Sequence, residues 1–304
     1  MNGLTDLLTS TSKTLAVSIS LLPSPLRTEV SIAYLLLTVA DILEQAPLWS
    51  ARQRVMALAK LDVLVGTGDT SAAAWDSAEW AEAIPYPDVA DYALLGELPS
   101  LLEAAGAIDS TARATIVRHV RRTVSGMVEL RTRNGVPGEI ELKGIADLRH
   151  YCYVVAGINC EMLTELFVEQ GHLPRSRAVD LLKQCRAFGE GLQLVNMLED
   201  AEDPLRHGRS LLPAGIDRAR LFALAHEDLD VASAYVSTMT EAGASWGVAG
   251  FTMLPIRYAR ETLQRIAGIF PAARLSRLRQ PVHCEVTGQR RHLTSAGIEV
   301  TLVL

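Results

Sequence analysis

Apolar side chains recur at three- and four-residue steps along most of the chain, which is the spacing of one face of an α-helix. The clearest stretches run over residues 30–41, 151–166 and 188–198. Prolines and glycines that favour turns separate the periodic stretches, and no alternation of strands with helices is visible. The pattern predicts an all-α protein with about nine to eleven helices.

The C-terminal end of the chain follows a different pattern. From Val282 to Leu304 it is rich in β-branched and polar residues, with Gly288 and Gly297 in two predicted turns. Residues 283–287 could pair with residues 299–303 as a short β-hairpin, although a flexible tail explains the same composition. We therefore expect a single helical domain over residues 1–281 and a C-terminal extension over residues 282–304.

Composition narrows the classes of function. With 304 residues, 49% hydrophobic and 21% charged, the chain has the make-up of a folded globular protein. A net charge of −6 argues against a nucleic-acid binder. The cysteines are scattered and form no CxxC pair, which disfavours a disulfide scaffold or a structural zinc site and favours the cytoplasm.

The sequence shows neither a secretory leader nor an uninterrupted apolar run long enough to span a membrane. Its mean hydropathy is +0.17, so peripheral contact with a membrane surface or a greasy ligand stays open.

The most informative segment is an acidic stretch at residues 191–203. On a helix, Asn196, Asp200 and Asp203 fall on one face, and Glu199 lies four residues before Asp203. Like charges at that spacing destabilise a helix by a few tenths of a kcal/mol unless a cation lies between them. Mg²⁺, which prefers carboxylate oxygens and completes its shell with water and phosphate, is the natural candidate. A solvated acidic helix end is the alternative.

Two further segments carry polar groups on apolar helices. Asp41 follows a nearly continuous apolar helix, and Glu44 lies about one turn further on, where a carboxylate either caps a turn or faces a cavity. Tyr151, Val155 and Asn159 fall on one face of another predicted helix at four-residue steps. A buried structural helix explains either segment equally well when it is taken alone.

Taken together and in this order, the segments resemble the squalene/phytoene synthase family over residues 12–269. The resemblance rests on residues 12–15 (SKTL), 34–44 (YLLLTVADILE), 126–129 (GMVE), 151–157 (YCYVVAG), 192–196 (LQLVN) with Asp200, and 208–213 (GRSLLP). Several motifs in the correct order are far more specific than any one of them.

The resemblance implies an isoprenoid-synthase-like helical bundle whose central cavity binds an allylic prenyl diphosphate through Mg²⁺. It implies catalytic roles for Asp41, Asp200 and Tyr151. The metal ligands that it implies are Asp41, Glu44, Asn196, Glu199, Asp200 and Asp203. The substrate contacts that it implies are Ser12, Lys13, Tyr34, Thr38, Gln45, Val155, Asn159, Cys160, Gln193 and Arg209. In such chemistry the metal and basic groups neutralise the leaving diphosphate, and a water-excluding pocket protects the allylic cation.

The chain also departs from the family's usual motifs. Thr38 stands where an arginine commonly precedes the first aspartate, and Gln45 stands where a second acid usually follows it. Asn159 and Cys160 replace an aliphatic residue and a glycine beside the prenyl tunnel, while Glu199 replaces the arginine of the second motif. The spacing of the second motif's last two aspartates is one residue short. These changes predict a weakened first diphosphate site and a more polar pocket.

Three functions are consistent with this pattern. Our prediction is a Mg²⁺-dependent transferase that moves a prenyl group from one allylic diphosphate to a small acceptor without a diphosphate, such as an aromatic ring in specialised metabolism. Head-to-head condensation of two prenyl diphosphates is the first alternative. A non-catalytic family member is the second, and the retained Asp41 and Asp200 argue against it. Donor chain length and oligomeric state stay open.

Overall fold

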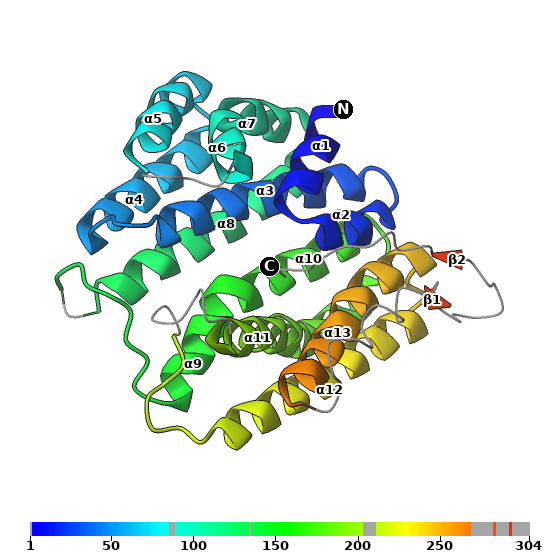
Figure 1. The fold of residues 1–304 in the computed structure, drawn as a ribbon. Coiled ribbons are helices and arrows are strands. Elements are labelled where there is room, and N and C mark those ends of the chain that lie inside the picture. Colours follow the sequence, from blue (N-terminus) through cyan, green and yellow to red (C-terminus); the bar gives the residue numbers. More distant parts are fainter. Residues whose placement is uncertain are drawn as a thin grey trace.

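The computed structural model describes residues 2–84, 89–133, 135–202 and 211–268, together with two short strands. In chain order the first helices are α1 (Asn2–Thr11), α2 (Lys13–Ser20), α3 (Leu26–Gln45), α4 (Ala51–Thr67), α5 (Thr70–Ala83), α6 (Val89–Gly96), α7 (Leu98–Ala107) and α8 (Ser110–Arg131). They are followed by α9 (Ile145–Cys152), η1 (Tyr153–Gly157), α10 (Ile158–Glu169), η2 (Arg175–Arg177), α11 (Ala178–Glu202), α12 (Arg218–Glu241) and α13 (Trp246–Ile266) (Figure 1). The all-α prediction is confirmed. The described residues hold more helices than expected because α1, α2, α6 and α7 are too short to show a periodic pattern.

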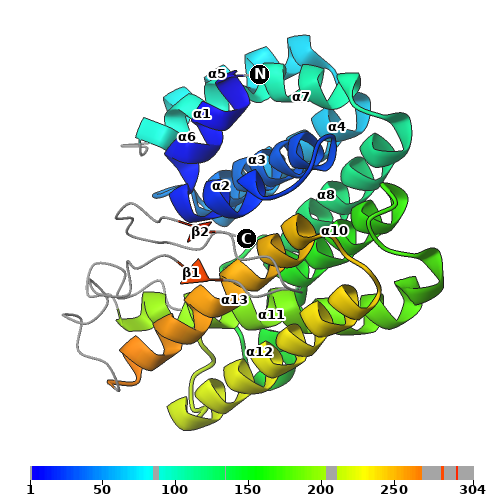
Figure 2. The same ribbon diagram turned by 90° about the vertical axis from the view of Figure 1, so that its right-hand side faces the viewer.

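Helix α3 is the core of the N-terminal half of the bundle. Every residue from Val30 to Ala40 is buried, as expected for a helix that is apolar on all sides. Helices α1, α2, α4, α6, α7 and α8 pack around it, and Figure 2 shows α1, α6 and α7 above α2 and α3. The predicted first acidic motif therefore lies at the C-terminal end of a helix that is packed against other helices on most of its sides.

Helices α9, η1 and α10 form one continuous helical stretch, Ile145–Glu169, in which η1 is a π-helical turn. By length and composition alone this stretch could cross a membrane, but 78% of its apolar window is buried inside the molecule. Burial of that extent is typical of the core helix of a folded domain. It packs against α8 on one side and α11 on the other, so it joins the two halves of the bundle.

Helix α11 lies among α9, η1, α10, α12 and α13 (Figure 1). It approaches the π-helical turn closely because Gly189 faces it: a Cβ atom there would lie 2.4 Å from the carbonyl oxygen of Ala156. Gly191 allows a similar approach to α12, where a Cβ atom would lie 2.8 Å from that of Asp228. These glycines let the helix of the second acidic motif sit in the centre of its layer.

The two strands are β1 (Val282–His283) and β2 (His292–Leu293), which pair antiparallel with Val282 opposite Leu293. A strand beginning near residue 283 was expected, but its partner is β2 rather than residues 299–303, which lie outside the described part of the chain. The nearer partner closes a shorter loop, which costs less conformational entropy. The domain boundary at residues 281 and 282 stays a prediction.

Candidate functional site

Asp41 lies near the C-terminal end of α3 and is only partly accessible. It makes no hydrogen bond or ion pair with any described residue. Its buried position raises the pKa of the carboxyl group well above the ordinary value, and the negative charge of Glu44 raises it further. A desolvated carboxylate without a counter-charge is costly for the fold, which makes Asp41 a candidate ligand for a cation.

Glu44, less than one turn away, has the opposite surroundings. Its side chain is 7% exposed and is bound by Arg131, which is 6% exposed and ends helix α8. Arg131 donates from Nη2 and Nε to Glu44 Oε1 at 2.6 and 3.0 Å, and from Nη2 to the Glu44 carbonyl oxygen at 3.1 Å. Of the two carboxylates of the first motif, Glu44 is therefore paired with Arg131, and Asp41 is not paired with any described residue.

Tyr151 lies beside these two carboxylates. Burial raises the pKa of its hydroxyl well above the ordinary value, and the charges of Glu44 and Asp41 raise it further while Arg131 opposes them. Such effects require short distances, so α9 brings Tyr151 to the acidic end of α3. The hydroxyl makes no hydrogen bond with a described residue. The structure therefore brings together Asp41, Glu44 and Tyr151, which the resemblance had placed in one site.

The π-helical turn separates Tyr151 from Asn159. Because a π-helical turn holds an extra residue, the four-residue register expected through Val155 does not continue across it. Asn159 instead accepts a hydrogen bond from the Thr123 hydroxyl at 3.1 Å and donates to the Val155 carbonyl oxygen at 2.7 Å. Tyr151 thus meets α3, whereas Asn159 is fixed to α8.

Cys160, the next predicted contact, is buried between α10 and α11. The position that a Cβ atom on Gly189 would take lies 2.9 Å from its sulfur. Burial raises the pKa of the Cys160 thiol well above its ordinary value. The side chain is packed against α11, and this packing explains its small size.

The predicted N-terminal contacts lie next to Tyr34 of α3. Ser12 is buried and caps α2, accepting a hydrogen bond from the Leu15 amide at 3.3 Å. Thr38 donates its hydroxyl to the Tyr34 carbonyl oxygen at 3.0 Å. The Tyr34 hydroxyl is buried without a hydrogen-bond partner among the described residues, and burial raises its pKa although the hydroxyls of Thr38 and Ser12 oppose the rise. Lys13 begins α2, but its side chain is outside the described part.

The second acidic motif forms a half-buried polar strip on α11. Gln193, Asn196 and Asp200 are partly accessible, whereas the residues between them are mostly buried. Glu199 forms an ion pair with Arg265 of α13. Asp203 and Arg209 lie outside the described residues. Gln45 ends α3 in an exposed position.

The donor atoms of the two motifs fit Mg²⁺. They are carboxylate and amide oxygens, and Asp41 has no counter-charge among the described residues. No three histidine, cysteine, aspartate or glutamate side chains within that part of the chain converge closely enough to hold a metal on their own. Mg²⁺ commonly binds through one or two carboxylates and takes its remaining ligands from water and substrate phosphate. Each motif would supply such a partial set of metal ligands. On α3 these are Asp41 and Glu44, and on α11 they are Asn196 and Asp200.

Two arginines near the site were not found from sequence. Arg131 binds Glu44, and Arg149 of α9 forms ion pairs with Glu190 of α11, at 3.3 Å, and with Asp228 of α12. Both partners of Arg149 are partly desolvated, which raises the pKa of each carboxyl group, while Arg149 opposes the rise. Only their positions in the sequence pointed to the site: Arg131 follows the 126–129 motif by two residues, and Arg149 precedes the 151–157 motif by two.

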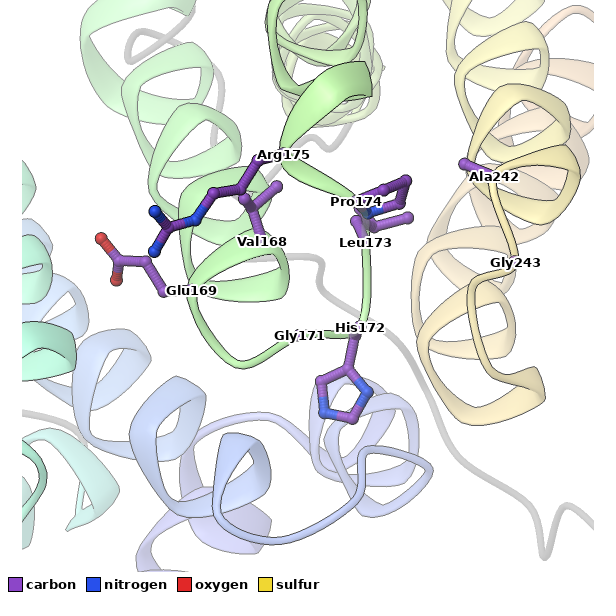
Figure 3. A pocket seen from close by; sticks show the side chains of 9 residues that line it. All are labelled: Val168, Glu169, Gly171, His172, Leu173, Pro174, Arg175, Ala242 and Gly243. Carbon is purple, nitrogen blue, oxygen red and sulfur yellow. The ribbon is translucent and has the colours of Figure 1, made fainter.

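Two cavities lie apart from these residues. One, of about 460 Å³, lies at the turn after α10, against the α12–α13 turn. Figure 3 shows Arg175 and Glu169 on one side of it and Ala242 and Gly243 on the other. The second, of about 710 Å³, lies between α8 and η1 and includes Arg118 and Tyr153. None of the predicted site residues that the structure describes lines either cavity.

Comparison with known proteins places the chain in a family. A model of the family "Squalene/phytoene synthase" matches residues 8–219. A squalene synthase of Candida albicans is 25% identical over 214 residues, which cover 69% of this chain and 45% of that protein. The chain therefore spans about half the length of the curated relatives that it matches.

Solved structures show the same fold. The complex of TcSQS with the ligand E5700 is 20% identical and covers 87% of this chain and 78% of its own, with a TM-score of 0.70. A dehydrosqualene synthase in complex with a ligand is 18% identical, with coverages of 91% and 93% and a TM-score of 0.51. The family model matches well over half of the sequence, and the chain belongs to the squalene/phytoene synthase family.

Proposed function

We propose that this protein is a magnesium-dependent prenyltransferase that condenses two allylic prenyl diphosphates head to head. The observation that carries the proposal is Asp41, a desolvated carboxylate without a counter-charge among the described residues, beside Glu44 and Tyr151. A metal–diphosphate complex is a ligand that supplies the missing positive charge and also needs the surrounding apolar helices.

Condensation is preferred over our sequence-based prediction of transfer to a polar acceptor. That prediction relied on the altered first diphosphate site at Thr38 and Gln45 and on Asn159 and Cys160 as polar groups in the pocket. In the structure Asn159 is hydrogen-bonded to Thr123 and Val155, and Cys160 packs against α11. Both residues therefore have structural roles, and the relatives named above carry the names squalene synthase and dehydrosqualene synthase.

The chemistry follows from the residues at the end of α3. A bound magnesium ion would neutralise the diphosphate as the allylic C–O bond breaks, and Asp41, Glu44, Asn196 and Asp200 would hold it. Tyr151 offers an aromatic face near the developing allylic cation, which favours positive charge. The second prenyl chain supplies the electrons of its double bond, a C–C bond forms, and a proton leaves. The apolar surroundings of α3 keep water from capturing the cation.

Transfer from a single donor remains the second candidate because of two residues. Where the family commonly carries an arginine, Thr38 has a hydroxyl that is already hydrogen-bonded within its own helix. Where the family commonly carries a second acid, this chain has the amide of the exposed Gln45. Each lost charged contact to a phosphate costs about 1.5–3 kcal/mol, which would weaken one of two diphosphate sites.

Product analysis distinguishes the two candidates. The protein is incubated with C5, C10, C15 or C20 allylic diphosphate and Mg²⁺, with and without aromatic acceptors, and the products are identified by mass spectrometry. Condensation predicts a coupled product of two prenyl chains from the donor alone. A prenylated acceptor that forms only when the acceptor is present would support the second candidate instead, and no diphosphate release with any donor would overturn both.

A further inference from the structure

Arg131 donates hydrogen bonds to both the side chain and the backbone carbonyl oxygen of Glu44. It lies 87 positions away in sequence and comes from the end of α8. Both its side chain and that of Glu44 are almost completely buried. A buried pair of this kind is held in one geometry, because either charge alone would be very costly.

The hydrogen bonds that Arg131 donates to the Glu44 carboxylate all reach the same oxygen, Oε1. Nε and Nη2 both donate to Oε1, at 3.0 and 2.6 Å. The other oxygen, Oε2, makes no hydrogen bond with any described residue. Arg131 thus fixes the carboxylate and leaves one oxygen of it for another ligand.

A second arginine supports the same helix end without touching Glu44. Arg54 donates to the Ala46 carbonyl oxygen from Nε and Nη2, at 3.3 and 3.2 Å. It also donates to both carboxylate oxygens of Glu139 at 3.1 Å, and Arg131 reaches the same carboxylate from Nη1 at 3.3 Å. The two arginines hold the last carbonyl groups of α3, where positive charge is favourable.

We propose that Arg131 is a positioning residue for cation binding at the end of α3, acting through Glu44. By holding Oε1 it fixes Oε2 as the one oxygen that Glu44 contributes, next to the unpaired carboxylate of Asp41. Glu44 and Asp41 then form a two-carboxylate set for a divalent cation although Gln45 replaces the second acid. The inference rests on the proposed function, because the cation is the one that accompanies the diphosphate.

The test measures the dependence of substrate-analogue binding on Mg²⁺. An unreactive allylic thiodiphosphate is titrated by calorimetry at several Mg²⁺ concentrations, and the concentration that gives half-maximal binding is determined. The proteins are the wild type, Arg131→Lys, Arg131→Met, Glu44→Gln and the double variant Arg131→Met/Glu44→Gln. Arg54→Met is the matched control, since it removes an arginine of the same network that does not contact Glu44. Circular dichroism confirms that each variant is folded at the temperature of the titration.

The proposal predicts that Arg131→Met and Glu44→Gln each raise the half-maximal Mg²⁺ concentration about tenfold or more, the usual effect of losing a residue that orients a metal ligand. The double variant should show no larger shift than either single variant, because both remove the same oriented oxygen. Arg131→Lys keeps a charge but loses the planar fork, and an intermediate shift is expected. Arg54→Met should lower Tm and leave the Mg²⁺ dependence within about twofold of the wild type.

The outcomes separate the inference from the function. Normal Mg²⁺ dependence in Arg131→Lys and Glu44→Gln would overturn the positioning role while the proposed function stands. An equal shift in Arg54→Met would also overturn it, because the effect would then come from general loosening of the helix end. No Mg²⁺-dependent binding by the wild type would overturn the proposed function and the inference together.

Discussion

Two carboxylates less than one turn apart on α3 have opposite electrostatic surroundings. Asp41 has no counter-charge among the described residues, so its buried position raises its pKa, whereas Glu44 is held by Arg131. Pairs of acids whose surroundings differ in this way commonly have different tasks. The candidate site therefore combines a carboxylate without a counter-charge among the described residues with one that is paired inside the fold.

Substitution of the two residues should change stability in opposite directions. Asp41→Asn removes a desolvated carboxylate without breaking a bond, so we expect an unchanged or higher Tm and a loss of turnover of about a hundredfold or more. Glu44→Gln takes the buried carboxylate from Arg131 and leaves it only the largely exposed carboxylate of Glu139, so it should destabilise the protein by up to about 3–5 kcal/mol. Thermal unfolding with a diphosphate-release assay checks both. A clearly lower Tm for Asp41→Asn would show that Asp41 has a structural partner.

Glu29, in the first turn of α3, predicts a pH-dependent stability. It is completely buried, accepts a hydrogen bond from Gln170 at 2.9 Å through Oε1, and has no partner for Oε2 among the described residues. Burial, followed by the charges of Asp109 and Glu169, raises its pKa from 4.5 to about 7. The folded protein thus holds a proton that the unfolded chain releases above pH 4.5. This contribution to stability is complete below pH 4.5 and is lost as pH rises through about 7.

We expect Glu29→Gln to be more stable than the wild type at pH 8 by about 1–3 kcal/mol, with the difference shrinking toward pH 5. Urea unfolding at several pH values measures it, and the exposed Glu103→Gln serves as the control. A constant difference between wild type and Glu29→Gln across this pH range would contradict a proton bound at Glu29.

At the scale of elements, the π-helical turn is the feature that the sequence did not predict. The periodic pattern correctly placed a helix over residues 151–166, because apolar spacing reports which residues are buried. The apolar pattern could not predict the π-helical turn at Tyr153–Gly157, because the residues of this turn are themselves mostly apolar and buried. For the same reason Tyr151 and Asn159 were expected on one face of their helix, whereas in the structure Tyr151 lies near the acids of α3 and Asn159 is bonded to α8.

The close contact between α11 and this turn should be sensitive to a single methyl group. In Gly189→Ala the added carbon would lie 2.4 Å from the Ala156 carbonyl oxygen, so we expect a loss of about 1–3 kcal/mol or more. Gly106→Ala in α7 meets no atom within 4 Å and should stabilise the protein by about 0.4–1 kcal/mol. Chemical denaturation compares the two. Equal effects of the two substitutions would mean that α11 does not approach the turn this closely.

For the whole molecule, sequence predicted the fold class and the family, since both depend on spacing and on the order of motifs. It also brought Asp41, Glu44 and Tyr151 together through the resemblance. It did not find Arg131, because a pairing between positions 44 and 131 depends on how α3 and α8 pack. The polar acceptor pocket was inferred from residue type alone, and the hydrogen bonds of Asn159 give that residue a structural role.

Head-to-head condensation requires that the folded chain bind two allylic diphosphates together with Mg²⁺. This requirement can be measured by calorimetric titration of the wild type with an unreactive allylic thiodiphosphate, in Mg²⁺ and then in excess EDTA. We expect two equivalents bound per chain in Mg²⁺, little binding in EDTA, and strongly reduced binding by Asp41→Asn. A single equivalent would contradict head-to-head condensation, and binding that is unchanged by EDTA would contradict a metal-dependent site at the end of α3.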